Sequence, residues 1–233
     1  MLPWLHPSIL AFPHPDTALD DPNGLLAAGG DLSKERLVLA YRNGIFPWFS
    51  EDEPILWWSP NPRCVIHPEH THVSKSLKKH IKRHPNWRVR FDTAFEEVIN
   101  HCADTRHDTG TWISDQIISA YTQMHDEGIA HSIEVYNEED RLIGGLYGLS
   151  MGKLFFGESM FSLETNASKV AFVALNRQLA RWGFPLVDCQ VENNHLLSLG
   201  ATSISRKAFL NYIDLYIDLP NEHQWRFDPD ILQ

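Results

Sequence analysis

Cysteine is scarce in this sequence, and the few cysteines follow no disulfide or metal-binding pattern. The 233 residues include three cysteines, Cys64, Cys102 and Cys189, and no Cys-x-x-Cys spacing joins any two of them. Small secreted proteins usually carry an even number of closely spaced cysteines that pair as disulfides. We therefore expect no disulfide framework, and a reducing cytoplasm is the compartment that suits this chain.

The sequence also lacks segments that would direct the chain into or across a membrane. It has no run of about 18 apolar residues, which a transmembrane helix requires. The first 15 residues have no basic start and no apolar stretch, and prolines interrupt them at positions 7, 13 and 15. A secretory signal needs both features. We expect neither a membrane span nor a secretory signal.

Positive charge is in the minority, with 20 Lys and Arg against 30 Asp and Glu and a net charge of −10. This balance argues against a protein that binds nucleic acid over its whole surface. Residues 74–90 differ, because they contain no acidic residue and carry Lys75, Lys78, Lys79, Lys82, Arg83, Arg88 and Arg90. One basic patch on an acidic chain favours a local contact with a polyanion. A solvated helix face would show the same charges.

Aromatic and apolar residues are plentiful, with eight Trp, twelve Phe and 43% hydrophobic residues overall. A chain of this length can form one large domain, or a small domain joined to a mid-sized one. Residues 1–62 are rich in Pro, Gly and Trp and read as irregular, apart from a helix over 33–43 with Ser33 as its N-cap. We place a domain boundary near Pro62, which gives a small domain over 1–62 and a larger one over 63–233.

The larger domain contains regular elements whose order suggests its fold. We predict helices over 73–84, 93–102, 114–127, 166–182, 194–199 and 205–216. The second of them opens with a T-x-x-E capping box formed by Thr93 and Glu96. Strands are predicted over 87–91, 131–136, 142–149, 154–161, 186–191 and 201–204. This order resembles the GNAT acyltransferase fold. The predicted class is α+β, a GNAT-like mixed sheet flanked by helices, with a small N-terminal α/β domain.

The loop that follows the fourth strand of that sheet lacks glycine. In GNAT enzymes this loop reads Gln/Arg-x-x-Gly-x-Gly/Ala, and its amides hold the pyrophosphate of coenzyme A. Here the corresponding residues, 162–169, read SLETNASK. A bulky, acidic turn keeps backbone amides away from a diphosphate. The fold therefore suggests acyl transfer, while the loop argues against acetyl-CoA as the donor.

Two predicted strands carry polar residues at alternate positions. Asp188 and Gln190 are two residues apart, so we expect them on one face, with Cys189 on the other. Phe156, Glu158 and Met160 are expected to share a face in the same way. In a GNAT-like sheet the two strands are neighbours that separate around the acyl group. A carboxylate and an amide facing this point suit the handling of an amine, and a buried, satisfied polar cluster is the alternative.

Two further patterns have structural explanations that compete with functional ones. His67, His70 and His72, with Glu69, have a spacing that zinc could use, although Pro68 and the polar context favour a surface loop. Cys189 is a possible nucleophile, but no basic residue precedes or follows it closely, which favours a core thiol. We expect no metal and no cofactor.

Ten short segments together give the sequence a specific resemblance. They are GGDLS (29–33), GIFPWFS (44–50), WWSPNPR (57–63), GTWIS (110–114), HSIEVY (131–136), GGLYG (144–148), GESMFS (157–162), NASK (166–169), DCQ (188–190) and SLGA (198–201). In this order they resemble the leucyl/phenylalanyl-tRNA–protein transferases, which are GNAT-like aminoacyltransferases. The resemblance covers residues 24 to about 212.

The resemblance implies an activity and roles for individual residues. Members of this family transfer leucine or phenylalanine, or methionine, from aminoacyl-tRNA to the N-terminal Arg or Lys of a protein, which marks the protein for N-degron degradation. By match to the family motifs, Asp188, Gln190 and Glu158 are the expected catalytic residues. The expected substrate-binding residues are Trp48, Trp112, Tyr121, Leu146, Met160, Phe172, Leu175 and Val187.

The expected partners follow from the same resemblance. The donor ester is already activated, so the reaction needs neither ATP nor a metal, and the α-amino group of the acceptor is partly neutral near pH 7 because its pKa is about 7.7–8.0. Lys75, Lys78, Lys79, Lys82 and Arg83 are the expected tRNA contacts. Trp48, Phe49, Trp57, Trp58 and Trp112 offer rings for stacking the RNA end, although some of them suit an inter-domain core. We expect a monomer.

Two other functions remain open at this point. A GNAT acetyltransferase that uses acetyl-CoA would fit the predicted fold, and the glycine-free loop over 162–169 argues against it. A non-catalytic RNA-binding adaptor would explain the basic helix and the tryptophans. It would leave the polar residues at 158, 188 and 190 without a purpose.

Overall fold

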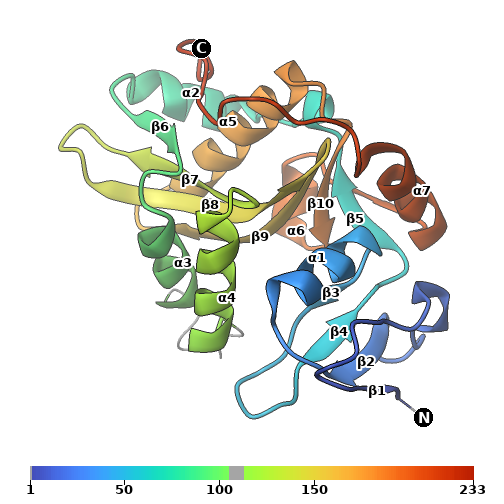
Figure 1. Ribbon diagram of the computed structural model, residues 1–233. Coiled ribbons are helices and arrows are strands. Elements are labelled where there is room, and N and C mark those ends of the chain that lie inside the picture. Colours follow the sequence, from blue (N-terminus) through green and yellow to red (C-terminus); the bar gives the residue numbers. More distant parts are fainter. Residues whose placement is uncertain (1, 105–112) are drawn as a thin grey trace.

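Two β-sheets organise the chain (Figure 1). The structure is a computed structural model and describes residues 2–104 and 113–233. A four-stranded sheet has the strand order β1-β2-β4-β3, and a seven-stranded sheet has the order β11-β5-β10-β9-β8-β7-β6. The proposed domain boundary near Pro62 lies between the last strand of the small sheet and the first strand of the large one.

The small sheet corrects the expectation that residues 1–62 are mostly irregular. Its strands are β1 (Trp4–Leu5), β2 (Leu25–Gly29), β3 (Phe46–Pro47) and β4 (Leu56–Trp58). The helix α1 (Lys34–Arg42) packs beside them, and the side chain of Ser33 caps it as predicted by accepting the amide of Arg36. Trp57 is fully buried, and its indole donates a hydrogen bond to the carbonyl of Gly29 at 2.8 Å. Strands this short give too few positions for an alternating pattern to show.

The large sheet is mixed, as predicted. Its strands are β5 (Arg63–Ile66), β6 (Arg88–Phe91), β7 (Ala130–Tyr136), β8 (Leu142–Met151), β9 (Leu154–Ser162), β10 (Leu186–Gln190) and β11 (Thr202–Ile204). The successive pairs β6–β7, β7–β8 and β8–β9 are antiparallel, and β9 pairs parallel with β10. Strand β5 then pairs antiparallel with both β10 and β11.

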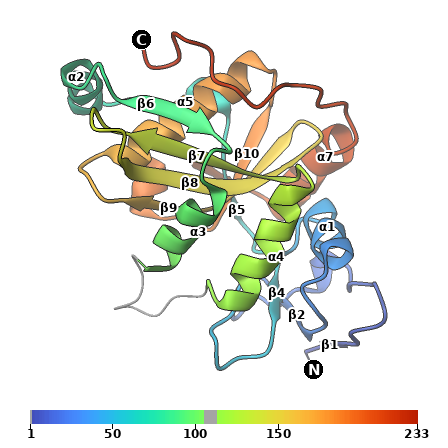
Figure 2. The same cartoon turned by 60° about the vertical axis from the view of Figure 1, so that its left-hand side comes forward.

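Helices cover both faces of the large sheet (Figures 1 and 2). The helices α3 (Phe95–Asp104) and α4 (Asp115–Asp126) pack on one face, and α5 (Ala167–Arg181) packs on the other. The remaining helices are α2 (Lys75–Arg83), α6 (Asn194–Ser198) and α7 (Arg206–Tyr216), and the 3₁₀ turns are Pro15–Thr17 and Pro68–His70. No helix among residues 2–104 and 113–233 is long and apolar enough to span a bilayer.

Two expectations about local structure are wrong. The helix α3 begins at Phe95, and Thr93 does not cap it, because the Thr93 hydroxyl donates instead to Glu134 on β7 at 2.9 Å. A tertiary hydrogen bond has displaced the local one that the T-x-x-E pattern favours. The prediction also missed β5, whose four residues are all buried. This strand matters for the site because it places Arg63 beside β10.

Candidate active site

The site lies where β9 and β10 separate. The two strands are paired from Leu154 to Phe156 and from Leu186 to Asp188, and beyond that point they diverge. A cavity of about 540 Å³ opens between them, within the size range of small-molecule sites. We call it the apolar cavity. Five of the predicted substrate-binding residues line it together: Leu146, Met160, Phe172, Leu175 and Val187.

A second, smaller hollow of about 270 Å³ adjoins the apolar cavity. Phe46, Pro47 and Trp48 of the small sheet form one side of it, and Glu158 and Glu192 bring two carboxylates to its lining. We call it the acidic hollow. Glu158, Cys189, Gln190 and Asn193 line both spaces, so the two meet at these residues. Trp48, which the sequence assigned to substrate binding, lies in the acidic hollow and is 44% exposed.

Glu158 sits at this junction because β9 contains a bulge. Tyr147 of β8 pairs with Ser159 and Gly148 pairs with Gly157, so Glu158 has no partner residue on β8. The extra residue reverses the direction of the side chains that follow it. Phe156 packs against Tyr41, whereas Met160 packs against the cluster that contains α5. The expectation that Phe156, Glu158 and Met160 share one face is therefore wrong.

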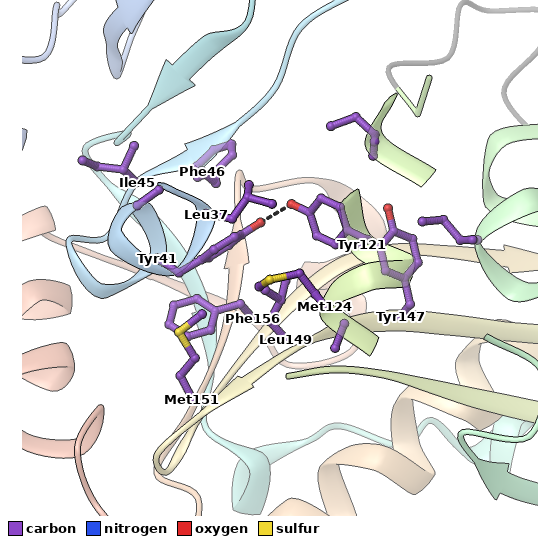
Figure 3. Close-up of a cluster of buried hydrophobic side chains, with 14 of the residues drawn as sticks. Leu37, Tyr41, Ile45, Phe46, Tyr121, Met124, Tyr147, Leu149, Met151 and Phe156 are labelled. Atoms are coloured by element: carbon purple, nitrogen blue, oxygen red, sulfur yellow. Dashed lines mark hydrogen bonds between the residues drawn. The ribbon is translucent and has the colours of Figure 1, made fainter. Parts of the chain in front are cut away.

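Two tyrosines hold the carboxyl group of Glu158. The hydroxyl of Tyr41, on α1, donates to Oε1 at 2.6 Å, and the hydroxyl of Tyr121, on α4, donates to Oε2 at 3.3 Å. The two hydroxyls also share a hydrogen bond of 2.5 Å, as Figure 3 shows for their side chains in the core cluster. Desolvation by burial raises the pKa of Glu158 to about 8, even though both tyrosine hydrogen bonds act to lower it. Tyr121, predicted to bind substrate, thus reaches the site through Glu158.

Asp188 is bound by an arginine that the sequence analysis missed. Arg63 donates from Nε to Oδ1 at 2.8 Å and from Nη2 to Oδ2 at 2.7 Å. Arg63 is fully buried and Asp188 is 2% exposed, and the guanidinium also lies over the rings of Phe46 and Phe209. Such a paired, hydrogen-bonded geometry is what allows two charges to remain buried.

Gln190 is oriented by two hydrogen bonds and by a second bulge. Asp188 lies opposite Val65 and Gln190 lies opposite Cys64, which leaves Cys189 as the extra residue. Gln190 has a φ of 55°, its backbone amide donates to Asp188 at 3.0 Å, and its Nε2 donates to the carbonyl of Gly157 at 2.6 Å. The prediction that Cys189 faces away from the site is wrong, because Cys189 lines both spaces. Asp188 lines neither of them.

The remaining expected residues lie outside the described chain or outside the cavities. Trp112 falls in the segment 105–112, beyond the described residues. His67 contacts the carbonyl of Pro185 at 3.0 Å, and within residues 2–104 and 113–233 no group of three His, Cys, Asp or Glu side chains is placed to hold a metal ion. Trp57 belongs to the core, which matches the alternative stated for some of the tryptophans.

In the loop over 162–169, two backbone amides donate hydrogen bonds within the loop itself. The amide of Ala167 donates to the carbonyl of Glu164 at 3.1 Å, and the amide of Ser168 donates to the hydroxyl of Ser162 at 3.3 Å. Asn166, just before α5, has a φ of 68°. A pyrophosphate at this helix terminus would have to displace these internal hydrogen bonds.

The basic side chains of α2 point away from the protein. Lys75, Lys78, Lys79, Lys82 and Arg83 are all exposed, while Leu77 anchors the helix in the core. In the described part of the chain, none of the five makes an ion pair. Arg88 and Arg90 differ, because both pair with Asp140.

The apolar cavity and its polar mouth have the geometry of an acyltransferase site. The apolar cavity suits an acyl group with a hydrophobic side chain, and its polar mouth suits an incoming amine. Comparisons with known proteins narrow this class. A family profile described as leucyl/phenylalanyl-tRNA protein transferase matches residues 65–214, and a profile for the N-terminal domain of the same proteins matches residues 30–61.

Curated relatives match nearly the whole chain. The leucyl/phenylalanyl-tRNA–protein transferase of Hahella chejuensis is 55% identical over 230 residues, which cover 98% of this chain and 97% of that protein. The enzyme of the same name from Stutzerimonas stutzeri is 54% identical over 97% of this chain and 100% of that protein. This chain belongs to the leucyl/phenylalanyl-tRNA–protein transferase family and is an aminoacyltransferase.

Solved structures align less closely with this chain. L-PGS from Bacillus licheniformis aligns with a TM-score of 0.41 and 10% identity, over 70% of this chain and 52% of that one. A GCN5-related glucosamine N-acetyltransferase region of a fungal β-N-acetylglucosaminidase aligns with a TM-score of 0.45 and 13% identity, over 78% of this chain and 23% of that one.

Proposed function

We propose that this enzyme transfers leucine or phenylalanine, or methionine, from aminoacyl-tRNA to an N-terminal Arg or Lys of an acceptor protein. The observation that carries the proposal is the meeting of the two spaces at Glu158 and Gln190. The apolar cavity takes the side chain of the donor. The acidic hollow takes the first residue of the acceptor, so that the amine reaches the ester carbonyl where the two spaces join.

The reaction needs orientation more than it needs a strong base. The acceptor nitrogen bonds to the ester carbonyl carbon, and the bond from that carbon to the ribose oxygen of the tRNA breaks. The amine loses one proton, and the released ribose oxygen gains one. Gln190 is placed to hold the amine, because its Nε2 is fixed on Gly157 while its Oε1 accepts no hydrogen bond from the described residues. Holding both ends in place is worth several orders of magnitude in rate.

Asp188 and Glu158 take different parts in this proposal. Arg63 engages both oxygens of Asp188, and one of them also holds the amide of Gln190, so Asp188 positions Gln190. Glu158 lines both spaces and has a pKa of about 8, near the pKa of an α-amino group. A group poised near the working pH is suited to accept and return a proton.

The preference for Arg or Lys is proposed to come from carboxylates at the acidic hollow. Arg63 compensates the charge of Asp188, so among the described residues the acid groups there without a cation are Glu192 and, once it ionises, Glu158. A cation next to the acceptor amine would lie near them, whereas an acidic first residue would be repelled at a cost on the order of 1 kcal/mol or more.

The tRNA is proposed to run along α2. The five exposed cations of this helix have no acidic partner among residues 2–104 and 113–233, and they can contact backbone phosphates. We place the activity in the cytoplasm, with the protein acting as a monomer, and we expect the products to be substrates of N-degron degradation. The use of acetyl-CoA is opposed by the loop over 162–169, because the amides of Ala167 and Ser168 at the start of α5 already donate within the loop.

A transfer assay tests the proposal directly. Purified protein is mixed with tRNA charged with labelled leucine or phenylalanine and with peptides that differ only in their first residue. We expect label on peptides that begin with Arg or Lys, much less on neutral starts and least on acidic starts. Equal labelling of all peptides, or transfer of acetyl groups from acetyl-CoA instead, would contradict it.

A further inference from the structure

Cys64 and Cys189 form a pair of thiols in the wall of the site. The bulge in β10 places both Cys189 and Gln190 opposite Cys64 of β5. The two cysteines belong to the same buried cluster, and each thiol is close enough to shift the pKa of the other. Cys189 lines the apolar cavity and the acidic hollow, and Cys64 lies behind it with 1% exposure.

The position of this pair suits a cross-strand disulfide. The register partner of Cys64 is Gln190, and Cys189 is the extra residue of the bulge next to it, so Cys189 also lies opposite Cys64. A disulfide joins Cα atoms about 4.4–6.8 Å apart, which is the range of residues that oppose each other across neighbouring strands. The bulge leaves Cys189 outside the regular ladder, so its backbone is freer to adjust than that of a paired residue. Any small oxidant that enters the apolar cavity also meets Cys189 in its wall.

We propose that Cys64 and Cys189 are a modification site at which peroxides form a disulfide, and that this disulfide stops aminoacyl transfer. One sulfur of the pair displaces water from hydrogen peroxide and becomes a sulfenic acid. The other sulfur attacks it, releases a second water and forms the S–S bond. Two thiols thereby lose two electrons and two protons, and one peroxide is reduced to two waters.

The contact between the thiols favours the first step. The neighbouring Cys189 thiol holds the pKa of Cys64 below its ordinary value, so Cys64 gives up its proton more readily than an isolated buried thiol. The same neighbour and burial raise the pKa of Cys189. The thiolate is the nucleophilic form of cysteine. The same contact places the second sulfur where it can resolve the sulfenic acid before further oxidation.

The disulfide acts on transfer through Gln190. Bonded sulfurs are about 2.0 Å apart, which is much closer than the sulfurs of two unbonded thiols can approach, so Cys189 has to move toward β5. Gln190 follows Cys189 directly and already holds a φ of 55°. Its contacts with Asp188 and Gly157 depend on this backbone, and they hold the amide that we assign to the acceptor amine.

The test combines chemistry and activity on the full chain. Purified protein is treated with hydrogen peroxide, digested without reduction and analysed by mass spectrometry. We expect a peptide pair joined through Cys64 and Cys189 that is two hydrogens lighter than its parts. Leucine transfer should fall at least about tenfold, in step with the joined peptide, and return after dithiothreitol.

Two single variants separate this site from general oxidation. Cys64→Ala should retain transfer after peroxide, because no disulfide can form, although Cys189 remains in the wall. Cys102→Ala should stay as sensitive as the parent, because Cys102 lies on α3 in the other buried cluster. Absence of the joined peptide overturns the proposal, and so does a joined peptide with unchanged transfer. Peptide mapping of the parent protein decides the first point even if a variant fails to fold.

Discussion

Two carboxylates lie on neighbouring strands at the same site, and their surroundings give them opposite properties. Asp188 is held by the guanidinium of Arg63, which pairs with both of its oxygens. Within the described part of the chain Glu158 has tyrosine hydroxyls alone as hydrogen-bond donors, and burial raises its pKa to about 8. The carboxylate that is paired with a cation holds structure in place, whereas the one with neutral donors and a raised pKa can gain and lose a proton near neutral pH.

Removing Arg63 should have the largest effect, because it takes away the cation that distinguishes the surroundings of Asp188 from those of Glu158. Arg63→Met leaves Asp188 buried without a counter-charge, and we expect the free energy of unfolding to fall by about 3–5 kcal/mol. Urea denaturation measures the change. The matched control is Arg42→Met, which breaks an exposed pair with Asp218 and should cost under about 1 kcal/mol. Equal losses in the two variants would show that Arg63 does not hold a buried charge.

Removing the carboxylate of Asp188 tests its positioning role. We expect Asp188→Ala to lower the single-turnover transfer rate by on the order of 10²-fold, with a smaller loss of charged-tRNA binding, because Gln190 loses the acceptor of its backbone amide. The pH profile of the remaining activity should keep its shape. An unchanged rate would remove Asp188 from the mechanism, and a lost pH dependence would make Asp188 the base instead.

Changing Glu158 tests whether its raised pKa makes the stability of the protein depend on pH. The folded protein keeps the proton of Glu158 up to about pH 8, whereas the unfolded chain loses it near the ordinary value of 4.5. The contribution of Glu158 to stability is therefore most favourable at low pH and declines as the pH rises from 4.5 to 8. Glu158→Gln should flatten this decline in denaturation curves measured across that range.

The same variant bears on acceptor choice. The preference for Arg over neutral first residues should grow between pH 7 and 9 in the parent protein, as Glu158 becomes charged. In Glu158→Gln the preference should be smaller and independent of pH. If the ratio of basic to neutral acceptors stays that of the parent at every pH, Glu158 is a structural group and Glu192 is the better candidate.

The smallest expected effect concerns the basic helix, which lies apart from both carboxylates. Joint replacement of Lys78, Lys79, Lys82 and Arg83 by Ala should weaken tRNA binding and leave single-turnover transfer at saturating tRNA unchanged. Each lost phosphate contact should lower the slope of log affinity against log salt by a little under about one unit. Binding titrations at several salt concentrations measure the slope, and an unaltered slope would mean that α2 is only a solvated face.

Long, regular elements of this fold were predictable, and short ones were not. The helix α5 and the strands β7 to β9 repeat their apolar residues over many positions, so their places could be predicted to within two residues. The strands β1 to β5 have two to five residues each, and neither β3 nor β5 alternates in burial. Their pairing partners, which lie elsewhere in the chain, decide that they are strands.

The same limit applies to the site. The family motifs led to Glu158, Asp188 and Gln190, and the structure brings these residues together. Each of the two bulges adds one residue to a strand, which turns the following side chains to the other face, and an alternating pattern has no signal for such an insertion. Arg63 was quoted within a motif without a role, because its partner is 125 residues away.

That separation has a consequence for the order of assembly. Strand β5 can join the sheet only after β10 has been made, because β10 is its neighbour and lies more than half the chain later. Contacts between distant segments form late, since a long loop must close first. We expect a chain that ends before Leu186 to leave β5 unpaired and Arg63 open to protease, which limited proteolysis of such a truncated chain would reveal. We therefore expect the enzyme to gain its activity in one of the last steps of its own folding.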